Sequence, residues 1–450
     1  MWRGCLAVGL LVLPCGAGQG QPLVDLAQPL PRSPLVNANP GFWALRSAPG
    51  VGADVRGWVV VSGGEVVADY YRAPTIETTD RANIWSVTKT WVATLVGMLV
   101  HSGQLETGTT LEGIFTGMDW STVTDGETKK TVTVGQLLSM SSGLSVNCFV
   151  DSSNQASLQA ALNFVSASST DSYGAAHQRG RMFYLCSSAI LGYVIHEVTG
   201  QTPLEYATAQ LFPALGIAGA VQWTPAYGAD GINECGHGLH LPPLALAKLG
   251  LLYRQRGVPA PGAAALLSSS FVDDSVTNQL TVAMSPSDTR CATRVIYLGF
   301  LTMADRCCRS FLGSRSDLCT FKTSSSGYGY LKWLFSPAGG TDEIDCAIGN
   351  QGQFICTWRD RDVVVAITSD DSGWFDVRLC GPRSSDRPSP ICCAQGYDSA
   401  CALLNAIHGR LNFATNDTRA SENQIRSSGS RGSKRSLVAT AVAAVAAAVF

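Results

Sequence analysis

The sequence predicts an α/β protein in which one antiparallel sheet is flanked by helices and interrupted by an inserted, mostly helical domain. Early in the chain, GWVVVSGGEVVADYYRA holds two β-branched runs separated by Gly63-Gly64, the pattern of a β-hairpin. Helical patterns with loops rich in Ser, Thr and Gly fill residues 105–235. Strand patterns return late, in YGYLKWLF, GQFICTWRD and RDVVVAITSD. The first hairpin and the last strands are therefore expected to share one sheet.

Each helix is supported by a local signal. The run NIWSVTKTWVATLVGMLVHSGQL is strongly apolar after Lys89 and predicts a buried helix. ILGYVIHEVTG predicts a helix that stops at Gly200, as a left-handed cap requires. LPPLALAKLGLLYRQRG predicts another helix that ends on glycine. Residues 21–50 are rich in proline and lack a period, so they are expected to wrap around the body as a leader.

The composition fits a globular, enzyme-sized protein. Of 450 residues, 46% are hydrophobic and 8% aromatic, which is enough for a sizeable core. The 32 Lys and Arg nearly balance 34 Asp and Glu, so the formal net charge is -2. Nucleic acid is not an expected partner, because binding by counterion release needs a concentrated positive surface.

Both ends of the chain indicate export. After Met1-Trp2-Arg3, the apolar run CLAVGLLVLPC and Gly16-Ala17-Gly18 have the order of a signal peptide, expected over residues 1–20. The last residues, 434–450, end in LVATAVAAVAAAVF behind the small residues SSGSRGS, as in a GPI-attachment signal. The spacer is short and positively charged, so a tail anchor or an incidental Ala/Val-rich helix is the alternative. We expect a secreted or cell-surface protein, attached to the membrane through this tail if the tail is a GPI signal or a tail anchor.

Cysteine usage agrees with export. Two of the 15 cysteines fall in the signal region, which leaves 13 between Cys148 and Cys401 and favours an oxidising compartment with disulfides. Their connectivity does not follow from the sequence. Asn416-Asp417-Thr418 is an expected glycan site.

The same patterns suggest domain boundaries. The sheet domain is expected to comprise residues 21–104 and 236–380, with the helical domain at 105–235. A cysteine-containing appendage and flexible stalk are expected over 381–433. The oligomeric state is not predicted.

The sharpest chemical feature is Ser86-Val87-Thr88-Lys89, at the start of the apolar helix. Positions i and i+3 share a helix face, so the Lys89 amine can reach the Ser86 hydroxyl. A hydroxyl becomes a good nucleophile when a base takes its proton, and burial that lowers the pKa of a lysine makes that lysine such a base. The helix N-terminus adds N–H groups where an oxyanion can form. An N-capping serine beside a solvated lysine is the plainer alternative.

Five ordered segments place this pair in context. They are IWSVTKTWVATLVGMLV, VTVGQLLSMSSGL, FYLCSSAILGYVIHEVTG, GHGLHLPPLALAKLG and AIGNQGQFICTWRDRDVVVAITSD. Over roughly residues 55–370 the chain resembles the serine β-lactamase and penicillin-binding-protein superfamily. It is most similar to class C β-lactamase-related hydrolases, including esterases and 6-aminohexanoate-dimer hydrolases. The resemblance implies a β-lactamase/transpeptidase-like fold.

The resemblance also implies roles for individual residues. Ser86 would be the nucleophile and Lys89 its base, while Tyr184 stands where the family has the Tyr of its YxN or YxS motif. Cys186 occupies the third position of that motif, which is a departure, and a one-residue shift would select Phe183 instead. Tyr184 as a core aromatic and Cys186 in a disulfide are the alternatives. Ser142, in Ser141-Ser142-Gly143, would flank the cleft, although a cap or turn is the simpler interpretation.

The last motif differs from its counterparts in the family. Where the family has KTG or HxG, this chain reads Gly349-Asn350-Gln351-Gly352-Gln353, which contains no cation. Gly352 would let substrate approach the backbone and Gln353 would supply the second oxyanion N–H, with Asn350 and Gln351 lining the site. Because a cation holds the substrate carboxylate of penicillin-type enzymes, a neutral ester or amide is the more suitable substrate. A Gly-rich start to a strand, as at a bulge, is the alternative.

Other chemistries have less support. No GxSxG elbow occurs, which argues against a Ser-His-Asp hydrolase, and no P-loop or dinucleotide motif suggests a cofactor. Residues 234–240 read ECGHGLH, whose spacing matches no metal site, so we expect no metal and interpret it as a Gly-rich loop before a helix. We therefore expect a hydrolase that cleaves a small-molecule or peptide-like ester or amide through an acyl-enzyme on Ser86. The alternative is a weak or inactive surface protein that serves as a binding or structural module.

Overall fold

The computed structural model describes part of the chain in detail. The described residues are 23–34, 55–77, 80–144, 158–164, 179–182, 187–217, 219, 221–224, 231–281, 323–337, 343–369 and 407. The chain divides into two compact units, Leu13–Asn405 and a second that combines Met1–Val12 with Ala406–Phe450. All described residues except Ile407 belong to the first unit, which carries everything discussed below. The predicted signal peptide, glycan site at Asn416 and tail fall outside the described residues, as does the predicted appendage with its stalk except for Ile407.

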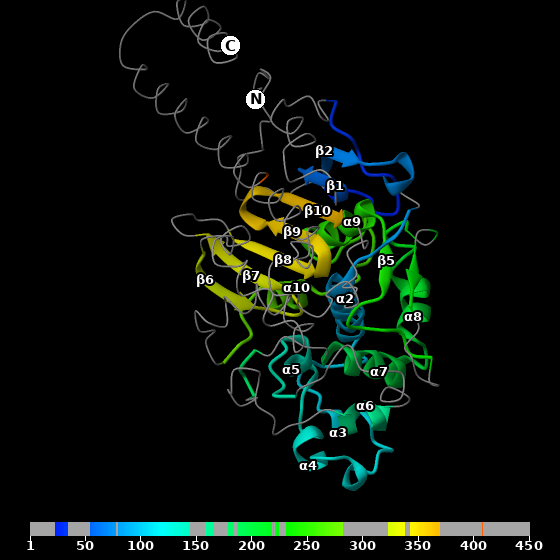
Figure 1. The fold of residues 1–450 in the computed structure, drawn as a ribbon, viewed down its shortest axis with the longest axis vertical. Coiled ribbons are helices and arrows are strands. Elements are labelled where there is room, and N and C mark those ends of the chain that lie inside the picture. The colour runs from blue at the N-terminus through cyan, green and yellow to red at the C-terminus, as the bar shows by residue number, and fades with distance from the viewer. Residues whose placement is uncertain are drawn as a thin grey trace, which may run out of the picture. The chain divides into compact units, whose positions relative to one another are not determined.

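A seven-stranded antiparallel sheet forms the core of this unit, in the order β2-β1-β10-β9-β8-β7-β6 (Figure 1). The first strand pairs with the last, with Trp58 opposite Ile367, so the predicted union of the two ends of the domain is confirmed. The strands are β1 (Val55–Ser62), β2 (Glu65–Tyr71), β6 (Thr323–Tyr328), β7 (Trp333–Pro337), β8 (Ile344–Gly349), β9 (Gln353–Trp358) and β10 (Val363–Ser369).

The predicted hairpin is also confirmed. Gly63 and Gly64 have φ values of 60° and 83°, the left-handed region that a tight hairpin turn needs and that glycine adopts without steric cost. A Cβ at Gly64 would lie 2.9 Å from the Val24 side chain, so the leader packs closely over this turn.

Residues 23–34 pack on the sheet domain, as the sequence suggested for the leader. Arg32 forms a parallel bridge with Val66 of β2 and an ion pair with Asp69. The buried Lys248 amine donates to the carbonyl oxygens of Leu26 at 2.8 Å, Gln28 at 3.0 Å and Leu215 at 2.8 Å. This lysine ties the leader to the helix that covers the sheet.

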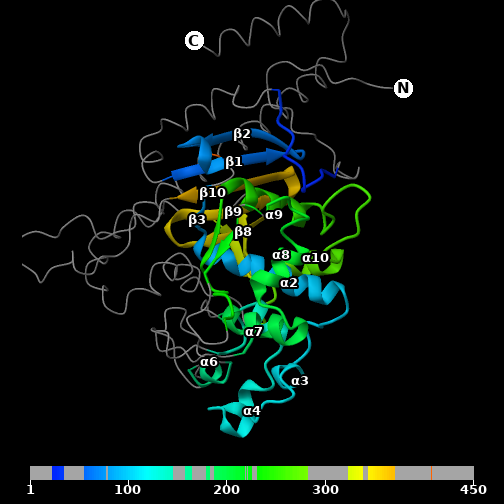
Figure 2. The same cartoon turned by 90° about the vertical axis from the view of Figure 1, so that its right-hand side faces the viewer.

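Helices occupy the middle of the chain (Figures 1 and 2). They are α2 (Thr88–His101), α3 (Leu111–Ile114), α4 (Gly126–Lys129), α5 (Val134–Leu138), α6 (Leu158–Phe164), α7 (Ser187–Thr199), α8 (Pro203–Gln210), α9 (Pro243–Arg254) and α10 (Ser269–Ser275). Short 3-10 turns are η1 (Pro74–Glu77), η2 (Trp85–Val87), η3 (Trp120–Thr122), η5 (Asn350–Gly352) and η6 (Arg359–Arg361). A small second sheet has the order β3-β5-β4, from β3 (Ala82–Asn83), β4 (Gln222–Trp223) and β5 (Leu239–Leu241).

Two helices, α9 and α2, pack against the large sheet. Helix α9 packs against β1, β9 and β10, and α2 packs against β8 and α7. Every residue of α2 from Thr88 to Leu99 is buried, which confirms the buried helix predicted from its apolar run. The predicted stop of α7 is confirmed too, since Gly200 has φ 70°. Within the described residues, no helix is both long and apolar enough to span a bilayer.

One strand prediction is wrong. The run YGYLKWLF contains the end of β6, a turn and the start of β7, with Tyr328 paired to Trp333. The turn is stabilised by long-range hydrogen bonds, from Tyr330 N–H to Ser275 and from Leu331 N–H to Leu138. A Cβ at Gly329 would lie 2.1 Å from the Ser275 carbonyl oxygen, so only glycine fits there. The β-rich composition could not reveal these distant partners.

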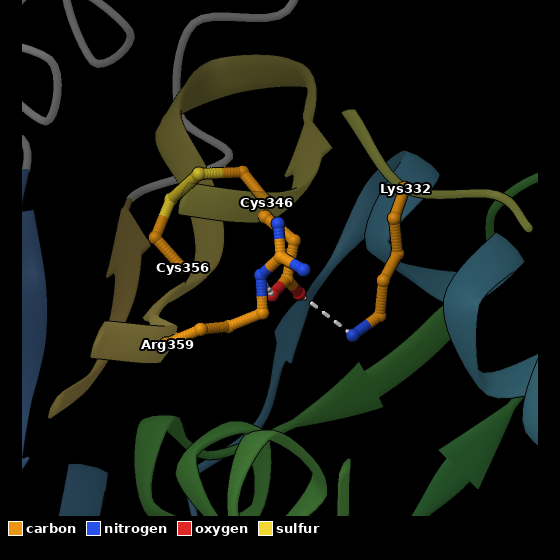
Figure 3. The surroundings of a disulfide bond; sticks show 5 residues. Lys332, Cys346, Cys356 and Arg359 are labelled. Atoms are coloured by element: carbon orange, nitrogen blue, oxygen red, sulfur yellow. Dashed lines mark hydrogen bonds and ion pairs between the residues drawn. A yellow bond between two sulfur atoms is a disulfide. The ribbon is translucent and has the colours of Figure 1, made fainter. Parts of the chain in front are cut away.

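Figure 3 shows a disulfide across the middle of the β8–β9 hairpin, next to a buried ion pair. Cys346 and Cys356 stand directly opposite one another, with Cα atoms 4.2 Å apart. Beside them the Lys332 amine donates to Asp345 at 2.8 Å, and Arg359 lies 3.8 Å from the same carboxylate. This disulfide agrees with the expected oxidising environment.

Replacing both Cys346 and Cys356 with alanine should lower the free energy of unfolding by about 2–3 kcal/mol, because the bridge restricts the unfolded chain. Urea denaturation followed by circular dichroism measures the difference. Cys235→Ala is the matched control, since Cys235 is a buried cysteine in the free form. A loss in the double variant no larger than that of the control would show that the bridge adds little.

Candidate active site

Ser86 lies in a strained turn immediately before α2. The helix begins at Thr88, so Ser86 belongs to the turn η2 and not to the helix itself. Trp85 has φ 48°, a left-handed conformation that is costly for a bulky side chain. Its N–H donates to Asn83 Oδ1 at 2.9 Å, and the Gly238 N–H donates to the same oxygen at 3.3 Å. Asn83 thus joins the serine turn to the loop that precedes β5.

The Lys89 amine reaches Ser86 directly. Lys89 Nζ lies 2.8 Å from Ser86 Oγ, one helical turn away as the spacing predicts, and it donates to the Gly236 carbonyl oxygen at 2.7 Å. The lysine side chain is buried, as are its sequence neighbours Trp85, Trp91 and Val92. The plainer alternative of a solvated lysine therefore does not describe this site.

Burial changes the acid–base properties of the site. It lowers the pKa of Lys89 from 10.5 to about 7. The charge of the Glu234 carboxylate has a smaller effect that raises this pKa. Burial also raises the pKa of Glu234, while hydrogen bonds from the Gly236 and His237 backbone and the charge of Lys89 act to lower it. At neutral pH the lysine therefore has a substantial neutral fraction, which a base requires.

The loop before β5 closes over the lysine. Glu234 Oε1 accepts the Gly236 N–H at 2.8 Å, and the Glu234 carbonyl accepts the Trp223 indole N–H at 2.8 Å. The rings of Trp85 and His237 are tilted against each other with centroids 5.8 Å apart. No group of three potential metal ligands occurs among the residues that the structure describes. The sequence analysis did not predict that this loop contacts Lys89.

The turn between β8 and β9 lies against the serine turn. A Cβ at Gly349 would be 2.4 Å from the Ile84 carbonyl oxygen and 3.3 Å from the Ser86 nitrogen. Gly349 therefore permits the close approach of β8 to the serine turn, a role that the sequence analysis did not assign to any residue.

The other members of this motif are placed as follows. Asn350 Oδ1 accepts the Gln351 N–H at 3.0 Å, and Gln351 and Gly352 have φ values of 59° and 86°. The buried Gln353 side chain exchanges two hydrogen bonds with the Ser369 backbone, at 3.1 and 3.2 Å. The side chain of Gln353 thus stabilises the strands, and its backbone N–H stays the predicted oxyanion donor.

Ser142 and the residues of the YxN-like motif complete the predicted set. Ser142 is buried, and its hydroxyl accepts the Leu144 N–H at 3.3 Å, as in the simpler interpretation of a turn. Phe183, Tyr184 and Cys186 lie outside the described residues.

This fold, with a serine and a buried lysine beside the turn of a sheet hairpin, defines a class of serine hydrolases. The β-lactamase family model matches residues 41–274, more than half of the chain, and the chain belongs to that family. It is 33% identical over 134 residues to penicillin-binding protein 4 of Amycolatopsis lactamdurans, covering 29% of this chain and 33% of that protein. The match thus spans about one third of that relative's length.

Two solved structures are similar in fold. One, assigned as a 6-aminohexanoate-dimer hydrolase from Bacillus anthracis, has a TM-score of 0.54 at 13% identity, covering 87% of this chain and 90% of that one. The other, assigned as a β-lactamase from Bacteroides dorei, has a TM-score of 0.56 at 16% identity, covering 83% and 98%. The predicted β-lactamase/transpeptidase-like fold is confirmed.

Proposed function

We propose that the protein is a serine hydrolase that cleaves an ester or amide bond through an acyl-enzyme on Ser86. The observation that carries this proposal is the 2.8 Å separation between Ser86 Oγ and the buried amine of Lys89. A desolvated amine at this distance is placed to take the hydroxyl proton.

The acylation step follows from this placement. Neutral Lys89 takes the Ser86 proton while Oγ bonds to the substrate carbonyl carbon and the carbonyl electron pair moves to oxygen. The Ser86 N–H and an N–H from the β8–β9 turn, for which Gln353 is the predicted donor, would stabilise that oxyanion. The tetrahedral intermediate then collapses, and the leaving group departs with a proton passed from Lys89, with Tyr184 as the predicted relay.

Deacylation repeats the same chemistry with water. Water adds to the acyl carbon and gives a proton to Lys89, and the bond to Oγ breaks as Ser86 regains its proton. One water is consumed for each ester or amide cleaved, which releases an acid and an alcohol or amine.

The substrate class follows from the last motif. Gly349-Asn350-Gln351-Gly352-Gln353 contains no cation that could hold a substrate carboxylate. A neutral small-molecule or peptide-like ester or amide is therefore favoured over a β-lactam or a D-alanyl peptide.

The proposed place of action is outside the cell or on its surface. The support is the signal-peptide pattern at residues 1–20, the cysteine content and the tail at 434–450. Release of the protein from cells by phosphatidylinositol-specific phospholipase is expected for a GPI anchor, and no release would exclude that anchor.

Labelling with a fluorophosphonate probe tests the proposed function. The native protein should incorporate one label, and Ser86→Ala should incorporate none, because the probe phosphonylates an activated serine. A native protein that stays unlabelled would favour the alternative, an inactive member of the family that acts as a binding or structural module.

The pH dependence of this labelling should report the lysine. Below the Lys89 pKa of about 7 the amine is mostly protonated and cannot act as base, so the labelling rate should rise about tenfold from pH 5 to 6 and about fivefold from pH 6 to 7. Above pH 7 the rate should level off. Second-order rate constants measured from pH 5 to 9 check this, and a rise that continues through pH 9 would mean that the amine titrates like an exposed lysine.

A further inference from the structure

Glu234 is a buried carboxylate beside the proposed base, and the hydrolytic steps above give it no role. Both Glu234 and Lys89 are only 2% exposed to solvent. A buried carboxylate is costly unless hydrogen bonds and an opposite charge compensate it. The position of Glu234 therefore calls for a compensating arrangement, and the structure shows one.

A single residue, Gly236, links the two side chains through the N–H and the carbonyl of two successive peptide groups. The carboxylate accepts the Gly236 N–H at 2.8 Å, and the carbonyl of the same residue accepts a hydrogen bond from Lys89 Nζ at 2.7 Å. The Glu234 backbone is fixed in turn, because its N–H donates to the Thr224 carbonyl at 3.1 Å and its carbonyl accepts the Trp223 indole at 2.8 Å. Glu234 thus holds Gly236 from one side while Lys89 contacts it from the other.

Among the described titratable groups near Lys89, Glu234 is the one whose negative charge acts on the amine. Cys235 is buried, and burial together with the nearby carboxylate raises the pKa of its thiol, so it stays neutral. The His237 ring packs on Trp85. On the elements packed against α2, the exposed groups are His196 and Glu197 on α7, Glu205 on α8, and Asp273 and Asp274 on α10. On β8, Asp345 is paired with Lys332.

A second buried pair shows the usual arrangement. Lys332 and Asp345 contact each other directly at 2.8 Å, as Figure 3 shows for the amine and its partner carboxylate. Lys89 instead donates to the Ser86 hydroxyl at 2.8 Å and to the Gly236 carbonyl at 2.7 Å, so its amine is directed at the hydroxyl. With Gly236 between them, the Glu234 carboxylate attracts the Lys89 ammonium without taking the position of the serine.

We propose that Glu234 is a positioning residue for Lys89: it orients the amine toward Ser86 through the backbone of Gly236 and serves as the counter-charge of that amine. The inference rests on the proposed function, in which Lys89 is the base. Two separable contributions follow, one from the negative charge and one from the hydrogen bond to Gly236.

Two substitutions separate these contributions. Glu234→Gln keeps an oxygen for the Gly236 N–H and removes the charge, so Lys89 should lose its proton more easily. The acidic limb of the fluorophosphonate rate profile should then move about one pH unit lower, with the plateau rate kept within about threefold. Glu234→Asp keeps the charge but shortens the side chain, so the limb should stay in place while the plateau falls about tenfold or more.

Asp345→Asn is the matched control, because it removes a buried carboxylate from the other lysine pair. It should lower the unfolding temperature without moving the acidic limb. Circular dichroism verifies that each variant is folded. A folded Glu234→Gln variant whose limb lies within 0.2 pH unit (about 0.3 kcal/mol) of the native limb would overturn the proposal.

Direct titration separates this proposal from the proposed function. In protein labelled with ¹³C at lysine Cε, with the Lys89 resonance assigned from Lys89→Met, the Lys89 pKa should be about one unit lower in Glu234→Gln than in the native protein. If the native protein takes no label at Ser86, the hydrolase proposal fails, and this titration still tests the link. An unchanged Lys89 titration would overturn it whether or not the protein is active. If Glu234→Gln does not fold, the same comparison is made with Glu234→Asp, whose Lys89 should titrate as in the native protein, and a shift there would contradict the charge role.

Discussion

Replacing Lys89 with methionine should slow fluorophosphonate labelling of Ser86 by about a thousandfold, because a positioned general base contributes roughly a hundred- to ten-thousandfold. Methionine has a similar length and suits a buried position, so the helix should be retained. The amine that lies 2.8 Å from Ser86 Oγ would be gone, and the serine would keep its proton. Labelling rates at pH 8 measure the loss, where the native amine is mostly neutral.

Lys129→Met is the matched control for this change. Lys129 is likewise buried, but it lies on α4 and not beside Ser86. Its amine donates to the Leu162 carbonyl at 2.7 Å. Its substitution should affect stability and leave the labelling rate within about threefold. Retention of more than a tenth of the native rate in Lys89→Met would mean that Ser86 is activated by another group.

Replacing Gly349 with alanine should produce the second large effect, a loss of about a hundredfold in labelling rate. The new Cβ would lie 2.4 Å from the Ile84 carbonyl oxygen, a backbone atom that cannot rotate away, so β8 and the serine turn must separate. A misplacement of about 1 Å in a catalytic group costs on the order of a hundredfold. The overpacking should also cost about 1–3 kcal/mol of stability.

Gly117→Ala serves as the control, because a Cβ at this exposed glycine would meet nothing within 4 Å. It should leave both the labelling rate and the unfolding temperature close to native. A Gly349→Ala variant with native labelling would show that the approach of β8 to the Ser86 turn has no part in acylation.

The local parts of this fold could be predicted from the sequence, because their signals lie within a few residues. The hairpin at Gly63-Gly64 depends on two adjacent glycines, and the Ser86–Lys89 distance depends on one helical turn. The arrangement of the whole fold was predicted from the family resemblance and not from these local signals.

The parts that failed depend on contacts between distant segments. Lys89 and the Gly236 carbonyl are separated by 147 residues, so nothing in the run ECGHGLH could show that it closes over the lysine. The turn at Gly329 likewise depends on Ser275. The sequence showed Gly349 only as the first residue of a motif. Its closeness to the Ser86 nitrogen arises when β8 packs against the serine turn.

The most direct measurement of the central claim is the mass of the protein during turnover of an activated ester. Acid quenching within milliseconds of mixing with p-nitrophenyl acetate, followed by peptide mapping, should find one acetyl group on the peptide that contains Ser86. That group should be absent from Ser86→Ala and strongly reduced in Lys89→Met. Acetylation spread over surface lysines, with the Ser86 peptide unmodified, would contradict an acyl-enzyme on this serine.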